Sequence, residues 1–166
     1  MPEHQLAERR YRISTAWGAF EAVFTERGLR EFHLPAARFR QRTELKGQEG
    51  ALGRQLRKAL RARLEGRRVN LPWEAFDLGG RPVFYRKVWR SMHRIPFGEV
   101  RSYLDMARSA GSAQAVRAAG SACGANPIVL FLPCHRVVSA SGPGGFGAGL
   151  KWKQKLLALE GYALKV

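Results

Sequence analysis

The spacing of apolar residues changes along this chain, and that change constrains the fold most. Short segments that alternate apolar and polar residues come first, separated by glycine-containing breaks, and span residues 11–16, 19–24 and 29–34. This pattern predicts three strands joined as hairpins, with one face of the sheet against a core. Leucines then recur every fourth residue from Leu52 to Leu64, which predicts an amphipathic helix over residues 51–65.

That helix is expected to end at Gly66 and to carry a basic outer face. We assign to this face Arg54, Arg57, Lys58, Arg61 and Arg63. A basic helix face could contact DNA or a membrane surface, or it could simply be solvated. Pro72, Gly79 and Gly80 interrupt the stretch that follows, so we place a domain boundary near residues 75–80.

Helical patterns dominate the second half of the chain. One helix is expected over residues 82–93, and a last helix over 150–160 that ends at Gly161. Their buried faces would carry Val83, Val88, Trp89 and Met92 in the first helix, and Trp152, Leu156 and Leu159 in the last. The glycine-rich segment 142–149 between them suits a lid over a pocket.

A helix-turn-helix is expected between those two helices. Ser102 is a good N-cap, and Asp105 three residues later resembles a capping box, which predicts a helix over residues 103–109. A Gly111-Ser112 turn then leads to an alanine-rich helix over 113–122, whose only charged residue is Arg117. Two short helices joined in this way can place the second one in a DNA groove, although a plain helical hairpin within a core has the same pattern.

The predicted fold class is therefore α/β (α+β). Residues 1–78 would form a small N-terminal domain with a three-stranded antiparallel sheet and a basic helix. Residues 79–166 would form a mainly helical C-terminal domain with the helix-turn-helix and a reactive cysteine.

The charge of the chain indicates a polyanionic partner. Its 29 Lys and Arg against 13 Asp and Glu give a net charge of +16, which favours nucleic acid, although a solvated surface that only aids solubility is compatible with the same charge. No apolar run approaches membrane-spanning length and no signal-peptide core is evident, so we expect a cytoplasmic protein without membrane contact. Two cysteines, Cys123 and Cys134, do not suggest a disulfide framework.

Cys134 and His135 are the candidate reactive pair. They follow the apolar run 127–131, which predicts a buried strand or extended segment, and Pro133 biases the backbone toward an extended form. Adjacent side chains in an extended chain point to opposite sides, so a water would bridge thiol and imidazole. An imidazole can turn a thiol into a nucleophilic thiolate, although an isolated Cys-His pair is also common as core packing.

The residues around this pair resemble the active-site signature of the O6-alkylguanine-DNA alkyltransferases. The resemblance lies in Gly124-Ala125-Asn126-Pro127, Cys134-His135-Arg136-Val137, the approach 96–103, the lid 144–150 and the last helix 156–161. It is dense from about Leu78 to Tyr162 and weaker before that.

The resemblance implies an alkyl transfer to Cys134. His135 would take the thiol proton through water, and Glu160 would orient the imidazole. Asn126 would tie the turn after the recognition helix to the active-site segment. The thioether product has no hydrolysable centre, so each chain would act once, without cofactor or metal.

The resemblance also implies double-stranded DNA containing O6-alkylguanine, or O4-alkylthymine, as the partner. The helix-turn-helix would bind the minor groove as a monomer, with cooperative binding along DNA left open. Arg117 would fill the gap left by the flipped base, and Tyr103 would crowd the target phosphate and act as an acid toward the guanine. The remaining DNA-binding residues would be Ser102, Ala118 and Gly120, and the base pocket would be lined by Tyr103, Val129, Val137, Phe146, Gly147 and Ala148.

Three other functions are compatible with parts of the pattern. An alkyltransferase-like protein that binds lesions without repairing them would lack the nucleophile, whereas Cys134 is present. A cysteine hydrolase would turn over repeatedly and would need neither the charge nor the helix-turn-helix. A transcriptional regulator is disfavoured because one recognition helix offers no half-site spacing.

Overall fold

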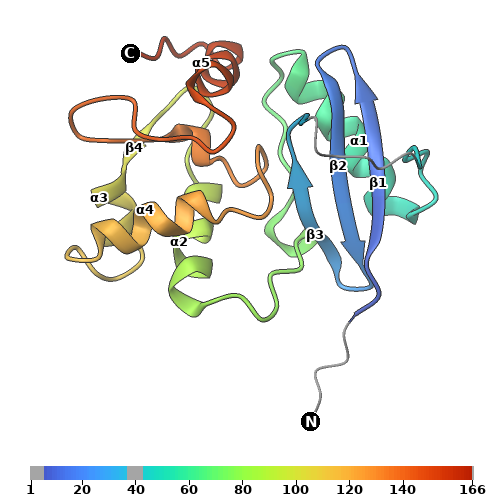
Figure 1. The fold of residues 1–166 in the computed structure, drawn as a ribbon, viewed down its shortest axis with the longest axis horizontal. Helices are drawn as coiled ribbons and strands as arrows, with labels where there is room; N and C mark the ends of the chain where they lie inside the picture. Colours follow the sequence, from blue (N-terminus) through green and yellow to red (C-terminus); the bar gives the residue numbers. More distant parts are fainter. Residues whose placement is uncertain (1–5, 37–42, 166) are drawn as a thin grey trace.

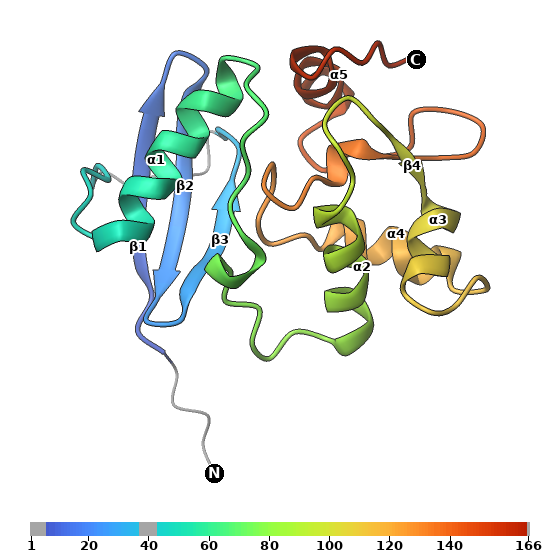
Figure 2. The same cartoon turned by 180° about the vertical axis from the view of Figure 1, so that it is seen from behind.

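The computed structural model describes residues 6–36 and 43–165. Its first half is an antiparallel sheet in the order β1 (Arg9–Thr15), β2 (Gly18–Thr25) and β3 (Gly28–His33). Helix α1 (Gly50–Leu64) lies across one face of this sheet (Figures 1 and 2). The three predicted strands and the first predicted helix are confirmed, as is the α+β fold class.

Helix α1 packs through the leucine stripe and ends where the sequence indicates. Leu56, Ala59 and Leu60 are buried. Gly66 has a φ of +78°, and the amide of Arg67 donates to the carbonyl of Ala62, which closes the helix with a left-handed glycine.

The basic outer face of α1 is only partly as predicted. Arg54, Arg57, Lys58 and Arg61 are exposed, but the prediction for Arg63 was wrong, because this residue is only 3% exposed. Arg63 lies seven residues after Leu56, so the helical repeat places it on the buried stripe.

The second half is mainly helical and contains a short parallel strand pair that the sequence did not indicate. Its elements are η1 (Trp73–Ala75), α2 (Val83–His93), β4 (Arg101–Ser102), α3 (Tyr103–Ser109), α4 (Val116–Gly124), η2 (Cys134–Arg136), β5 (Val137–Val138) and α5 (Leu150–Leu159). No helix in the described ranges is long and apolar enough to cross a membrane.

The buried faces of α2 and α5 differ in part from the predicted ones. In α2, Val88, Trp89 and Met92 are buried, but Val83 is 60% exposed because it opens the helix at its free end. In α5 the buried residues are Lys153, Leu156 and Leu157, whereas Trp152 and Leu159 are only half-buried. The helix is therefore rotated relative to the predicted face, and it buries a lysine.

The predicted capping box and helix-turn-helix are present. The Ser102 hydroxyl accepts from the amide of Asp105 at 3.1 Å, and the Asp105 carboxylate accepts from the amide of Ser102 at 2.8 Å. After the turn at Gly111, α4 begins three residues later than predicted, because residues 112–115 form a separate turn. The indole of Trp89 donates to the carbonyl of Ala122 at 2.8 Å, which anchors α4 on α2.

The edge strand β3 joins the two halves. The amide of Phe32 donates to the carbonyl of Pro127 at 2.8 Å, and the amide of Val129 donates to the carbonyl of Phe32 at 3.0 Å. The ring of Phe32 stacks on Phe20 and contacts Phe131, so one apolar core runs through both halves. The division into domains at residue 78 stays a prediction.

Replacing Ser102 with alanine tests the capping box. The substitution removes the acceptor for the Asp105 amide, so the free energy of unfolding should fall by about 1 kcal/mol. Chemical denaturation measures this loss. The exposed Ser109 of the same helix supplies a matched Ser109→Ala control, and an equal loss in both variants would contradict the role of the cap.

Candidate active site

The segment that carries Cys134 and His135 is a helical turn, so the extended backbone predicted for it was wrong. Residues Cys134–Arg136 form the 3-10 helix η2, in which the amide of Arg136 donates to the carbonyl of Pro133 at 2.9 Å. Pro133 has a ψ of 68°, which turns the chain instead of extending it. Adjacent side chains on such a turn diverge by about a third of a turn and need not point to opposite sides.

The apolar run before this turn is also less regular than predicted. In this run, Ile128 pairs with Phe32 of β3 in an isolated bridge, and the chain then reverses direction at Leu130. Leu130 is the one non-glycine residue with a positive φ, +78°, in the described part of the chain. A bulky residue is strained in this conformation, and surrounding contacts must hold it there.

Asn126 fixes the two ends of this loop. Its side-chain amide donates to the carbonyl of Leu132 at 2.6 Å, and its side-chain oxygen accepts from the amide of Ile128 at 3.0 Å. Asn126 therefore connects the end of α4 to the backbone just before Cys134.

The imidazole of His135 is completely buried, and only one of its two ring nitrogens bonds to a carboxylate. Its Nε2 lies 2.8 Å from Oε1 of Glu160, the C-cap residue that follows α5. An ionised carboxylate can only accept, so Nε2 carries the hydrogen and Nδ1 presents a lone pair. Nδ1 is buried and has no hydrogen-bond partner among the described residues, which leaves it available as a proton acceptor.

Glu160 is held by two guanidinium groups as well as by His135. Arg136 reaches it through Nε at 2.8 Å and through a second nitrogen at 2.7 Å, and Arg63 reaches it at 3.1 Å. The amide of Gly98 lies 3.4 Å from the other carboxylate oxygen, Oε2. The Glu160 side chain is 4% exposed, so this is a buried cluster of one negative and two positive charges.

The charges of this cluster fix the protonation state of each member. Hydrogen bonds from His135 and Arg136 outweigh burial and hold the pKa of Glu160 far below its usual range. Burial lowers the pKa of His135 to about 4, and the positive charges of Arg136 and Arg63 act in the same direction against the pull of Glu160. His135 is therefore neutral at pH 7.

The thiol of Cys134 is buried beside Asn126 and Lys153. Burial raises the pKa of Cys134, while the Asn126 amide and the Lys153 ammonium act in the opposite direction. Lys153 is itself fully buried, and its Nζ donates to the carbonyls of Val137 at 2.6 Å and Gly145 at 3.1 Å. The resting cysteine is thus a neutral thiol with a cation close by.

A cavity of about 580 Å³ opens onto Cys134. The predicted site residues that line it are Asn126, Val129, Cys134, Phe146, Gly147 and Ala148. Val137 is fully buried and Tyr103 lies outside the lining, so the structure does not bring these two predicted pocket residues to the cavity wall.

Tyr103 lies instead against the glycine-rich segment. Its hydroxyl accepts from the amide of Gly145 at 3.3 Å, and burial raises its pKa. A Cβ added at Gly144 would lie only 2.8 Å from that hydroxyl, so the tyrosine and the segment pack closely.

The residues of the helix-turn-helix that were predicted to bind DNA differ in how exposed they are. Arg117 is exposed on α4, and Ala118 and Gly120 are half-buried. The hydroxyl of Ser102 is occupied by the helix cap. Arg117 is therefore the exposed residue among those predicted to bind DNA.

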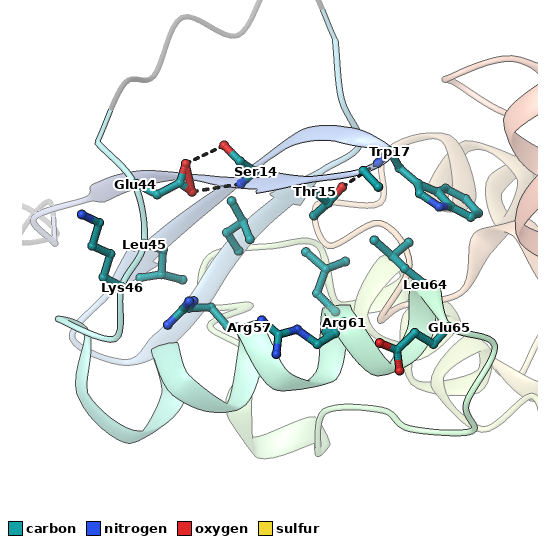
Figure 3. Close-up of a pocket in the computed structure, with 13 residues that line it drawn as sticks. Ser14, Thr15, Trp17, Glu44, Leu45, Lys46, Arg57, Arg61, Leu64 and Glu65 are labelled. Carbon is teal, nitrogen blue, oxygen red and sulfur yellow. Dashed lines mark hydrogen bonds between the residues drawn. The ribbon is translucent and has the colours of Figure 1, made fainter.

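A second cavity, of about 660 Å³, lies between β1 and α1 (Figure 3). Arg57, Arg61 and Lys46 line it together with apolar residues that include Leu60 and Leu64. The described residues that line it include no cysteine or histidine, so the candidate chemistry belongs to the cavity at Cys134.

Sequence reasoning missed three members of the site, namely Arg63, Arg136 and Lys153. Arg136 stands inside the signature but received no role. Lys153 and Arg63 each lie at helical spacing from buried leucines, which was a usable signal. Among the described residues, no group of three His, Cys, Asp or Glu side chains could hold a metal ion.

Known proteins resemble this chain in two comparisons: sequence relatives match about half of it, and solved structures match nearly all of it. Residues 83–162 match the family described as 6-O-methylguanine DNA methyltransferase, DNA binding domain. A methylated-DNA--protein-cysteine methyltransferase of Mycolicibacterium paratuberculosis is 54% identical over 85 residues, which is 51% of each chain. A probable enzyme of the same name from Acanthamoeba polyphaga mimivirus is 51% identical over 84 residues, which is 51% of this chain and 56% of that protein. The matched stretch thus spans about half the length of these curated relatives.

Solved structures match over nearly the whole chain. A crystal structure of Mycobacterium tuberculosis OGT in complex with DNA has a TM-score of 0.76 and 32% identity, and the match covers 91% of both chains. A crystal structure of the M. tuberculosis O6-methylguanine methyltransferase has the same TM-score with 30% identity and covers 93% of both chains. On these matches, the chain belongs to the O6-methylguanine-DNA methyltransferase family.

Proposed function

We propose that this chain repairs DNA by direct reversal of damage, moving an alkyl group from O6 of guanine to Cys134. The observation that carries the proposal is the buried Nδ1 of His135, which has no partner among the described residues while Glu160 holds the opposite ring nitrogen. A base fixed in this way, next to a thiol at the wall of a cavity, suits activation of a nucleophile.

The thiol proton would pass to Nδ1 of His135 through one water. Glu160 keeps the hydrogen on Nε2, so the lone pair of Nδ1 stays available. The positive charge of Lys153 would stabilise the thiolate as it forms, since it acts on Cys134 in the direction of ionisation.

The transfer itself makes one bond and breaks one. The Cys134 sulfur would attack the alkyl carbon, and the electron pair of the carbon–oxygen bond would stay on O6 of the base. A proton must reach the leaving guanine, and the Tyr103 hydroxyl near the glycine-rich segment is the candidate donor. The products are normal guanine and a thioether on Cys134, so the protein would be spent after one event.

The target base must leave the helix before it can reach a buried thiol. We propose that α3 and α4 bind the minor groove, that Arg117 fills the gap in the base stack, and that Ala118 and Gly120 allow close approach. Ser102 would act through the cap that positions Tyr103 at the start of α3. The net charge of +16 supports binding to a polyanion.

The proposed reaction needs neither cofactor nor metal, and one chain would suffice as a monomer. O4-alkylthymine would be a second substrate, since its alkyl carbon presents the same electrophile. A reducing compartment such as the cytoplasm would suit a protein that depends on a free thiol.

A lesion-binding protein without transferase activity is the alternative. Such a protein would share the helix-turn-helix and the cavity but would not need a thiol beside a histidine base. The arrangement of Cys134, His135 and Glu160 favours the transferase.

Replacing Cys134 with serine should abolish alkyl transfer and leave lesion binding intact, because a serine alkoxide forms far less readily than a thiolate. Intact mass after incubation with a duplex containing O6-methylguanine measures the transfer. Wild type should gain a single methyl group per chain and then stop. Cys123→Ser is the matched control, since Cys123 lines the same cavity and should be dispensable. A gain of mass by Cys134→Ser would contradict the assignment.

Replacing Arg117 with alanine should slow repair of duplex DNA by tenfold or more, on the order of 1.4 kcal/mol, while reaction with the free O6-methylguanine base is unchanged. A free base has no stack to leave, so it needs no residue to fill the gap. Single-turnover rates on both substrates measure the difference. Arg57→Ala removes the same charge from the exposed face of α1 and should affect neither rate. Equal losses on both substrates would place Arg117 in the chemistry or the fold.

The pH dependence of transfer should reflect a neutral His135. Because its pKa is lowered to about 4, acidification should not protonate it until the pH nears that value. Single-turnover rates should therefore show no loss near pH 6.5, where free imidazole titrates. A loss near pH 6.5 that disappears in His135→Gln would show that the buried base is not held neutral.

A further inference from the structure

Arg63 reaches the candidate active site from the other half of the molecule. It is the fourteenth residue of α1, the helix that packs on the N-terminal sheet, and it is separated from Glu160 by 97 positions in the chain. Its guanidinium donates to Oε1 of Glu160 at 3.1 Å, the same oxygen that lies 2.8 Å from Nε2 of His135. Arg63 thus contacts the group that orients the proposed base.

A second contact places Arg63 on the strained loop before Cys134. Its other terminal nitrogen lies 3.3 Å from the carbonyl of Leu130, the residue with a φ of +78°. The same nitrogen lies 3.4 Å from the carbonyl of Val69, beyond the end of α1. Asn70 adds a bond to the carbonyl of Phe131 at 3.3 Å, so two neighbouring side chains hold this loop from outside.

The surroundings of Arg63 suit a permanent positive charge. The guanidinium carbon lies 4.5 Å from the centre of the Phe97 ring, and that of Arg136 lies 4.3 Å from the same ring. Burial lowers the pKa of Arg63 only to about 10, so the group stays charged at neutral pH. Such a buried charge is costly unless its hydrogen bonds are satisfied, and here Glu160, Leu130 and Val69 supply acceptors.

Arg136 alone could neutralise Glu160, since it binds both carboxylate oxygens. With Arg63 added, the cluster of Glu160, Arg136 and Arg63 carries one net positive charge next to His135. That excess disfavours a second positive charge on the imidazole.

We propose that Arg63 is a positioning residue of the Cys134 site, which adds to the effect of burial in keeping His135 neutral with Nδ1 free and holds the Leu130 turn in place. This inference rests on the proposed alkyl transfer, and it gives the N-terminal half a direct part in that reaction. Among the described residues, the charged groups that act on His135 are Glu160, Arg136 and Arg63. The thiol of Cys134, the preceding residue, is the titratable group beside it in the sequence.

Titration of His135 by nuclear magnetic resonance tests the proposal without any substrate. The imidazole carbon and nitrogen shifts report both the tautomer and the midpoint of protonation, and His135→Gln assigns the signal. In Arg63→Met the midpoint should rise by about one pH unit, because a nearby positive charge has been removed. In Arg63→Lys the charge remains, so the midpoint should stay close to that of wild type.

Arg61→Met is the matched control. Arg61 lies two residues earlier on α1, is exposed, and borders the other cavity (Figure 3). Its loss removes the same charge from the same helix and should leave the His135 midpoint unchanged. If Arg63→Met does not fold, Arg63→Gln supplies the neutral side chain for the comparison with Arg63→Lys.

The rate of methyl transfer provides the second measurement. With the His135 midpoint near 4 in wild type and about one unit higher in Arg63→Met, the ratio of the Arg63→Met rate to the wild-type rate should fall about threefold between pH 8 and pH 4.5, and the Arg63→Lys ratio should stay constant. An unchanged His135 midpoint in a folded neutral variant would overturn the role of Arg63. Absence of transfer in wild type would overturn the proposed function instead, whatever the titration gives.

Discussion

The buried carboxylate of Glu160 is the interaction on which the site depends. A carboxylate that is 4% exposed must be paired, because an isolated buried charge is strongly destabilising. Its partners come from three regions of the chain, since Arg63 belongs to α1, Gly98 to the loop after α2, and His135 and Arg136 to η2. Satisfying one side chain therefore fixes the relative positions of elements that the sequence separates widely.

Burial of the thiol and burial of the base have complementary effects in the proposed reaction. Burial raises the pKa of Cys134 and lowers that of His135, so both groups rest uncharged. The thiol is then weakly nucleophilic toward small electrophiles that reach the cavity from solvent. If the protein acts once, as proposed, it benefits from this restraint, because any stray reaction of Cys134 would spend it.

The sequence predicted the elements better than it predicted the site's geometry. Apolar alternation identified β1, β2 and β3, and Ser102 and Gly66 marked helix ends correctly, because these signals are local. The turn at Cys134 was mistaken for extended chain, since its conformation depends on Asn126 and on the contacts of Leu130. Arg63 and Lys153 were missed because residue type suggested a solvated face, although their helical spacing placed both on buried stripes. The contact between Arg63 and Glu160 joins residues that lie 97 positions apart, so the local sequence pattern cannot predict it.

The N-terminal half supports the reactive loop through its edge and its helix. Strand β3 bonds to the backbone at Pro127 and Val129, Asn70 bonds to Phe131, and Arg63 bonds to Leu130. A leucine in the left-handed region costs on the order of 1–3 kcal/mol, and it persists only where neighbours over-determine the conformation. These contacts supply that constraint from the N-terminal half, in addition to the bonds of Asn126 to the same loop. The loop is therefore held from both halves of the molecule, so the position of Cys134 is a property of the whole chain and not of its signature alone.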